Sequence, residues 1–446
     1  MSICIVRILA VFALCAGAAG TAGAQVSFRS AIDLALKHNP RVKIAEDDLK
    51  KASALLSEEK DLFIPSVTAS SGLGASSGIT LSVPTIFTVN AHSSVFSFSQ
   101  LADIRAGRSS VQAAALALAD VRLQVEEDTA TTYIGADYAT ARLIVIDEQY
   151  QQALRLVAIV QDRIDAGVDN ELELKKARRA AVAVSLRRLE LENKAVLLRM
   201  HLAQLIGISL ESIRTISASI PSQSALLMSA QSVAPDLSDA PGILSARADA
   251  RAKHERSFAD SRYTWLPQIT FDAQYGRISP FNDVSSYYNL HGNYNTLAAG
   301  VQIQIPILDQ RRKASARESA VDAMQAEHKV ALLTQQENET RLSQRHSVSE
   351  LKLRAELTEL DHDVAKSDMG AVLVRCEMGG GSRNETPTTP KEKLNAGIRE
   401  RQAYVEMLEA DGQLREALIH EIRQQGQMDE WLRSVNFPRD LTSRSP

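Results

Sequence analysis

The sequence predicts a mainly α-helical protein with four strands, organised as two halves that repeat the same order of parts. Charged, alanine-rich stretches run for many turns almost without proline or glycine, so long helices are expected. Short runs such as VQIQI (301–305) alternate apolar and polar residues with the period of a strand. Aromatic residues make up only 5% of the 446 residues, which suits helices better than an all-β fold.

The N-terminus has the pattern of a secretory signal peptide, residues 1–24. Arg7 supplies the positive charge, residues 8–19 are apolar, and Ala22-Gly23-Ala24 has the A-x-A form of a cleavage site. A short buried helix is the alternative. Cys15 could accept a lipid, but Leu14 precedes it where a small residue is needed. Lipidation is therefore the weaker interpretation.

The mature chain has few features of other protein classes. Cleavage of the signal would leave Cys376 as the only cysteine, so no internal disulfide is expected. No run of about 18 apolar residues follows the signal, which predicts no transmembrane helix. Any membrane crossing must therefore come from strands. The formal net charge of −4 gives no basic excess for binding nucleic acid.

The two halves repeat the same landmarks. Pro65 and Pro267, each before a strand, lie 202 positions apart. Asp103 and Asp309 lie 206 apart, and Arg163 and Arg375, each near a glycine, lie 212 apart. A repeat of about 200 residues indicates a duplicated domain rather than a solenoid. We expect a first repeat at residues 25–236, a second at 237–435 and a C-terminal tail at 436–446.

Long helices follow the strands of each half. Between Asp103 and Arg163 only Gly107 and Gly135 interrupt the helical composition, and this stretch would span on the order of 90 Å as a helix. Apolar and small residues then recur at three- and four-residue spacing, which predicts coiled-coil seams. An ordinary helical bundle core has the same spacing. The seam residues are Leu174, Ala177, Ala181, Val184, Leu191, Ala195, Leu198, Leu202 and Leu205, then Leu353, Leu357, Leu360, Val364, Ala371 and Val374.

The strand candidates come in two pairs, 66–74 with about 89–100, and 268–277 with about 296–308. Each has about the 9–11 residues that a tilted strand needs to cross a bilayer. In the second pair one face is apolar, with Ile269, Phe271, Tyr275, Val301, Ile303, Ile305 and Ile307, and the other carries glutamine and threonine. In the first pair only Phe96 and Phe98 support the alternation. A soluble two-stranded flap in each half is the alternative.

Four strands cannot close a membrane barrel by themselves. Each unpaired backbone group at an edge in lipid costs several kcal/mol. If the strands span a membrane, several chains must contribute to one barrel.

Catalytic and metal-binding motifs are missing from the sequence. It contains no H-E-x-x-H, G-x-S-x-G or G-x-x-x-x-G-K-[ST], so an enzyme is disfavoured. The nine histidines are scattered, which favours solvated surface positions over a metal site. We expect no cofactor.

Four motifs, in this order along the chain, make it resemble the TolC-like outer-membrane efflux proteins. They are the A-x-x-x-A-L-x-x-N-P-type opening at residues 31–40, the arginine-glycine tip running from Arg163 through Gly167 to residue 174, the Leu-Pro before a strand at residues 265–267, and the strand-to-helix junction from Pro306 through Asp309 to Arg312. Each motif is weak alone. Together, behind a signal peptide, they cover nearly the whole mature chain.

This resemblance implies a homotrimer in the outer membrane, with most of its mass in the periplasm. Each protomer would give four strands to one twelve-stranded transmembrane β-barrel, with the apolar strand residues facing lipid and Gln302 and Gln304 facing the lumen. Long coiled-coil helices would form a periplasmic α-barrel. The implied function is a passive exit duct for an efflux or type I secretion system, fed by an inner-membrane transporter and a periplasmic adaptor. The cargo cannot be inferred.

The resemblance also implies two kinds of site. The adaptor would dock on the helix-turn-helix tips, at Arg163, Gly167, Val168 and Asp169 in the first half and Arg375 and Gly379 in the second. A simpler interpretation is that the glycine caps a helix and the arginine complements the helix dipole. Glu392 and Asn395 would lie at the periplasmic gate, where the family often has acidic residues. On the alternative interpretation Glu392 is an ordinary solvated charge.

The second tip departs from the family pattern. Cys376 replaces an aromatic residue, Asn395 replaces an acid, and residues 378–390 are rich in glycine, threonine and proline. These differences bring the docking geometry of this tip into question. A soluble periplasmic coiled-coil scaffold or adaptor-like protein is the alternative for the whole chain, because it shares the signal peptide, the heptads and the low cysteine content.

Overall fold

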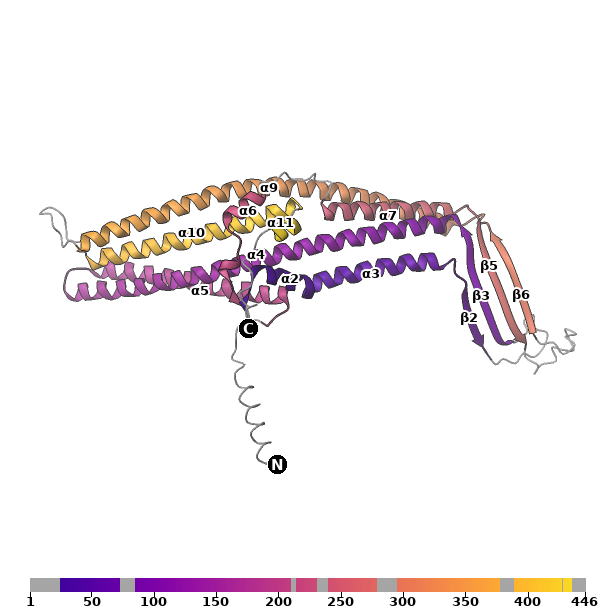
Figure 1. Cartoon of the computed structure of the whole chain (residues 1–446), viewed down its shortest axis with the longest axis horizontal. Helices are drawn as coiled ribbons and strands as arrows, with labels where there is room; N and C mark the ends of the chain where they lie inside the picture. The colour runs from indigo at the N-terminus through magenta and orange to yellow at the C-terminus, as the bar shows by residue number, and fades with distance from the viewer. Residues whose placement is uncertain are drawn as a thin grey trace, which may run out of the picture. The chain divides into compact units, whose positions relative to one another are not determined.

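The computed structural model describes residues 25–72, 85–209, 214–230, 240–278, 295–377, 389–426 and 428–434. The predicted signal peptide and tail, and Gly379, lie outside these residues. Helices dominate, as predicted (Figure 1). The elements are β1 Gln25–Val26, α2 Phe28–His38, α3 Pro40–Asp61, β2 Ser66–Ser71, β3 Thr85–Ser97, α4 Phe98–Asp165, α5 Glu171–Ile206, β4 Arg214–Thr215, η2 Ser217–Ser219, α6 Gln223–Ala230, α7 Pro241–Tyr263, β5 Gln268–Ile278, β6 Asn295–Gln304, α9 Gln310–Glu377, α10 Pro390–Gln424 and α11 Met428–Ser434.

The chain forms two compact units, each built from segments of both halves of the sequence. The first contains Met1–Lys43, Val121–Asp236 and Glu337–Pro446, and the second contains Ile44–Asp120 and Leu237–Gln336. We call them the helical unit and the strand unit. No helix among the described residues is long and apolar enough to cross a membrane.

The strand unit contains a four-stranded antiparallel sheet in the order β2-β3-β5-β6 (Figure 1). The central pair joins the two halves of the sequence: β3 pairs with β5 over its whole length, for example Phe271 with Ser93. In this unit α3 packs on α4, where a side chain at Gly107 would lie 3.0 Å from Leu56. Arg105 of α4 lies 3.8 Å from Glu255 of α7, so α7 packs beside α4 in this unit.

The strand ends differ from the prediction. β6 ends at Gln304, so Ile305 and Ile307 follow the strand rather than belong to it. Pro306 explains this, because it has no N–H to donate to a ladder. Asp309 then starts α9: its Oδ1 accepts a hydrogen bond from the N–H of Arg312 at 2.9 Å. In the first pair, Phe98 is the first residue of α4 rather than a strand residue.

Four long helices of the helical unit form a layer in the order α5-α4-α10-α9. Arg188 of α5 pairs with Asp147 of α4 at 2.8 Å. Arg142 of α4 pairs with Glu409 of α10 at 2.6 Å. His362 of α9 hydrogen-bonds Glu400 of α10, at 3.3 Å. The helices α5 and α9 therefore lie at the two edges of the layer.

The predicted seam of α5 is confirmed, and Arg188, the polar exception within it, pairs with α4. Most of its residues are buried against α4 and α10. The predicted seam of α9 is different: Leu353 is 69% exposed, Leu357 58% and Leu360 57%. These residues keep the coiled-coil spacing but are left uncovered by the helices that the structure describes.

The core of the helical unit joins both ends of the chain. The ring of Tyr133 packs edge-on against Phe28, with centroids 5.4 Å apart, and Trp431 of α11 also packs edge-on against Phe28, with centroids 6.2 Å apart. The Tyr133 hydroxyl donates to the Val26 carbonyl and accepts from the Ile216 N–H, both at 2.7 Å. This hydroxyl therefore ties α4 to the parallel pair β1-β4.

Candidate functional site

The first tip is the turn between α4 and α5, residues 163–173. Gly167 adopts a φ of 72°, and its N–H donates to the Ile164 carbonyl at 2.8 Å. The Val168 N–H donates to the Arg163 carbonyl at 2.8 Å, which completes a Schellman cap. Val168 is 62% exposed. The glycine therefore has the predicted capping role, and Val168 is available at the surface.

A cluster of charges links the first tip to the start of α10. Arg163 binds Asp169 through Nε at 2.9 Å. Lys391 Nζ lies 2.8 Å from Glu173 and 3.4 Å from Asp169. The hydrogen bond from Arg163 lowers the pKa of Asp169, and the hydrogen bond from Lys391 lowers that of Glu173. We call Arg163, Asp169, Glu173 and Lys391 the tip cluster.

The predicted gate residues lie in the first two turns of α10, next to the tip cluster. Thr389 and Glu392 form a capping box: the Thr389 hydroxyl accepts from the Glu392 N–H at 3.4 Å, and the Glu392 carboxylate accepts from the Thr389 N–H at 3.2 Å. Glu392 is exposed and Asn395 is half-buried. Glu392 therefore stabilises the start of the helix whether or not it lines a gate.

At the second tip the end of α9 and the start of α10 are described, and residues 378–388 between them lie outside the described residues. Arg375 is exposed, and its Nε donates to the Ala371 carbonyl of its own helix at 3.2 Å. Within the described residues Arg375 has no acidic partner like the one that Asp169 gives Arg163. The two tip arginines thus have different environments.

The strand register places the predicted lipid-facing residues within β5 and β6 on one face. Ile269 pairs with Ile303, Phe271 with Val301, and Tyr275 with Leu297. The opposite face is polar: Gln302 pairs with Thr270, and His92 of β3 hydrogen-bonds Asp272 of β5 at 2.6 Å. Val301 and Ile303 are each 64% exposed. The sheet therefore has one apolar and one polar surface.

Sequence reasoning missed several charged contacts. Lys391 was not recognised, because its partners Asp169 and Glu173 lie more than 200 positions away. The expectation that the histidines are solvated is wrong for His362, whose side chain is 14% exposed and packs on Tyr404 with ring centroids 5.0 Å apart. The only signal for these pairs was opposite charge, which is common along these helices.

Comparisons with known proteins agree with this architecture. Residues 31–208 match the model of the outer membrane efflux protein family. No curated protein matches the chain in sequence. Among solved structures, CusC is similar with a TM-score of 0.69, at 17% identity, covering 90% of this chain and 92% of CusC. The outer membrane protein VceC of Vibrio cholerae has a TM-score of 0.68 at 19% identity, covering 89% of this chain and 95% of VceC.

A third similar structure is the CmeC outer membrane channel of Campylobacter jejuni. Its TM-score is 0.67 at 16% identity, and the match covers 90% of this chain and 85% of CmeC. At these identities the structural matches establish the fold, and the family model supplies the sequence relationship. The chain thus shares the fold of these outer-membrane proteins over about nine-tenths of its length, and its residues 31–208 match the outer membrane efflux protein family.

Proposed function

We propose that this chain is one protomer of a homotrimeric exit duct in the outer membrane. The duct passively conducts substrate delivered by an inner-membrane transporter through a periplasmic adaptor, and no chemical step takes place. The observation that carries the proposal is that the sheet and the helical layer both end in elements that have no neighbour on one side in the described residues. The strands β2 and β6 are the edges of the sheet, and α5 and α9 are the edges of the helical layer.

Both edge helices carry an exposed apolar stripe with coiled-coil spacing. On α9 the stripe contains Leu353, Leu357, Leu360, Val364 and Val374, between 48% and 69% exposed. On α5 it contains Val182, Leu186, Leu189, Val196 and Met200, between 41% and 69% exposed. In both stripes the spacing alternates between three and four residues. Each stripe contains one polar residue at this spacing, Ser367 on α9 and Asn193 on α5. Such a seam is stable in water when a second helix covers it.

Two different edges on one protomer favour head-to-tail assembly. A contact of α5 with α9 of the next protomer is heterologous, and such contacts close into a ring when the rotation permits. Pairing of β6 with β2 of the next protomer would likewise remove the open edges of the sheet. Three copies give twelve strands, with the apolar face toward lipid and the polar face toward a water-filled lumen.

The sites follow from this arrangement. Arg163, Gly167, Val168 and Asp169, with Arg375 and Gly379, form the adaptor-docking tips. Glu392 and Asn395 line the periplasmic gate, and the tip cluster holds the start of α10 beside it. The repeats at 25–236 and 237–435 supply equivalent strands and helices to the duct wall. They follow a signal peptide at 1–24, which is cleaved.

Reconstitution into a planar lipid bilayer tests this function against the soluble scaffold. The purified mature chain is expected to give discrete current steps, and stepwise insertion of uniform units would support a closed pore. A folded protein that never conducts, even at high voltage and after loosening of the gate by Lys391→Glu, would overturn the duct and favour the scaffold.

A further inference from the structure

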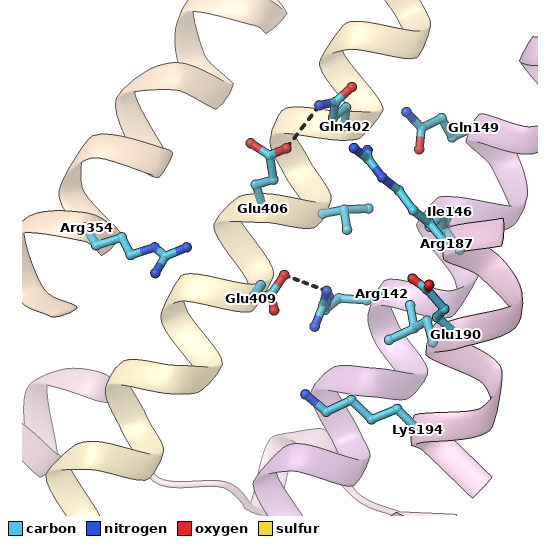
Figure 2. Close-up of a pocket in the computed structure, with 12 residues that line it drawn as sticks. Arg142, Ile146, Gln149, Arg187, Glu190, Lys194, Arg354, Gln402, Glu406 and Glu409 are labelled. Atoms are coloured by element: carbon cyan, nitrogen blue, oxygen red, sulfur yellow. Dashed lines mark hydrogen bonds and ion pairs between the residues drawn. The ribbon is translucent and has the colours of Figure 1, made fainter. Parts of the chain in front are cut away.

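A pocket of about 480 Å³ lies on one face of the helical layer (Figure 2). Its wall comes from α4, α5, α9 and α10, all within the helical unit. The volume is within the range of small-molecule sites in proteins. Ile146 of α4, Leu191 of α5 and Val405 of α10 give it an apolar floor, and the remaining lining is charged or amide-bearing.

The pocket lies on the face of α10 that carries the gate residues. From Glu392, steps of three and four residues lead through Asn395 and Arg399 to Gln402, Glu406 and Glu409. Residues at this spacing share one side of a helix. If Glu392 and Asn395 face the lumen, as the proposed function requires, this pocket opens to the same lumen.

Two of the three carboxylates of the pocket, those of Glu406 and Glu409, have donors. Arg142 binds Glu409 at 2.6 Å, and Gln402 donates to Glu406 at 3.0 Å. Glu190 lies on the same helical face as Arg187 and Lys194, three and four residues away. The acidic side of the pocket is therefore largely satisfied by its own neighbours.

The guanidinium groups are not satisfied in the same way. The guanidinium groups of Arg187 and Arg354 make no ion pair or hydrogen bond in the part of the chain that the structure describes. The Nε of Arg142 is buried and also lacks a hydrogen-bond partner there. Figure 2 shows Arg187 reaching from α5 across α4 toward α10, and Arg354 approaching α10 from the other side. Guanidinium groups have only donors. Those of Arg187 and Arg354 are exposed, so their acceptors are water or an anionic ligand that displaces it.

We propose that this pocket binds the carboxylate or phosphate of a small organic anion with an apolar body, as a transfer site on the duct wall. Arg187 and Arg354 bind the anionic group, and Ile146, Leu191 and Val405 contact the apolar body. The inference rests on the proposed function, since the anion arrives by passing along the lumen. A transfer site must release its ligand, so a dissociation constant on the order of millimolar is expected.

Arginine modification by phenylglyoxal, located by mass spectrometry on the detergent-solubilised full chain, tests the proposal. The probe is benzoate, and benzamide is its uncharged analogue. With benzoate at about three times its dissociation constant, modification of Arg187 and Arg354 slows about fourfold. Benzamide does not protect, and exposed Arg179 on α5 reacts at the same rate in every sample.

Two variants sharpen the result. Arg187→Gln is expected to abolish benzoate protection at Arg354, whereas Arg187→Lys keeps the charge and retains protection. Equal protection by benzoate and benzamide, or none by either, would overturn the anion site. The native mass of the same sample separates the two proposals, because a trimer without protection refutes only the pocket, and protection in a folded monomer refutes only the shared duct.

Discussion

Truncating the α9 stripe should dissociate the trimer without unfolding the protomer. Full burial of a leucine contributes about 2 kcal/mol. Leu353, Leu357 and Leu360 are still 57–69% exposed in the single chain, so assembly can bury about three-fifths of each and gain about 1 kcal/mol per residue. The triple variant L353A/L357A/L360A should therefore lose about 3 kcal/mol per interface, or roughly a 150-fold weaker contact.

The assay is the native mass of the purified protein in detergent across a dilution series, with circular dichroism as the measure of folding. The triple variant should dissociate at a much higher protein concentration than the wild type while its helix content stays unchanged. The matched control is I144A/L154A, which removes two exposed apolar side chains from the inner helix α4 and should leave the trimer intact. A triple variant as trimeric as the wild type would refute the α9 interface, as would equal dissociation of the control.

Three further changes test other parts of the account. Lys391→Glu removes the link between the first tip and α10 and should raise single-channel conductance or open probability. Lys393→Glu should not, because Lys393 is exposed and its side chain makes no ion pair with the described residues. Equal effects of the two changes would contradict the tip cluster. Burial, with nearby carboxylates, raises the pKa of Asp103 to about 7. The folded chain therefore binds more protons than the unfolded one, and its stability should fall as pH rises from about 4 through about 7. Asp103→Asn should flatten this fall in thermal melts, and an unchanged pH profile would contradict the prediction. Tyr133→Phe leaves a buried N–H and carbonyl without their partner and should cost about 1–3 kcal/mol by denaturant midpoint, with an unshifted midpoint as the contrary result.

The elements with partners inside the chain were predictable from the sequence. The spacing of residues 174–205 predicted the seam of α5, and the structure buries it against α4 and α10. The alternation at Ile269 and Phe271 likewise predicted β5 and its apolar face, which the register with β6 reproduces. In both cases a local period determines which side chains share a surface.

The features that depend on distant or absent partners were not predictable. The α9 stripe has the same spacing as the α5 seam, and periodicity alone does not tell which chain supplies the partner helix. The tip cluster joins Lys391 to Glu173 across 218 positions, and single charges on long helices give no signal for such pairs. The end of β6 at Gln304 was missed because the alternation continues through Ile305 and Ile307, although Pro306 breaks the ladder.

The most direct test of the central claim is the native mass of the protein after detergent extraction from a separated outer-membrane fraction. The account predicts recovery in that fraction as a particle of about three chains, because four strands close a barrel only when several protomers share them. Recovery as a soluble periplasmic monomer would contradict the shared duct, since β2 and β6 would then keep their open edges in the functional protein.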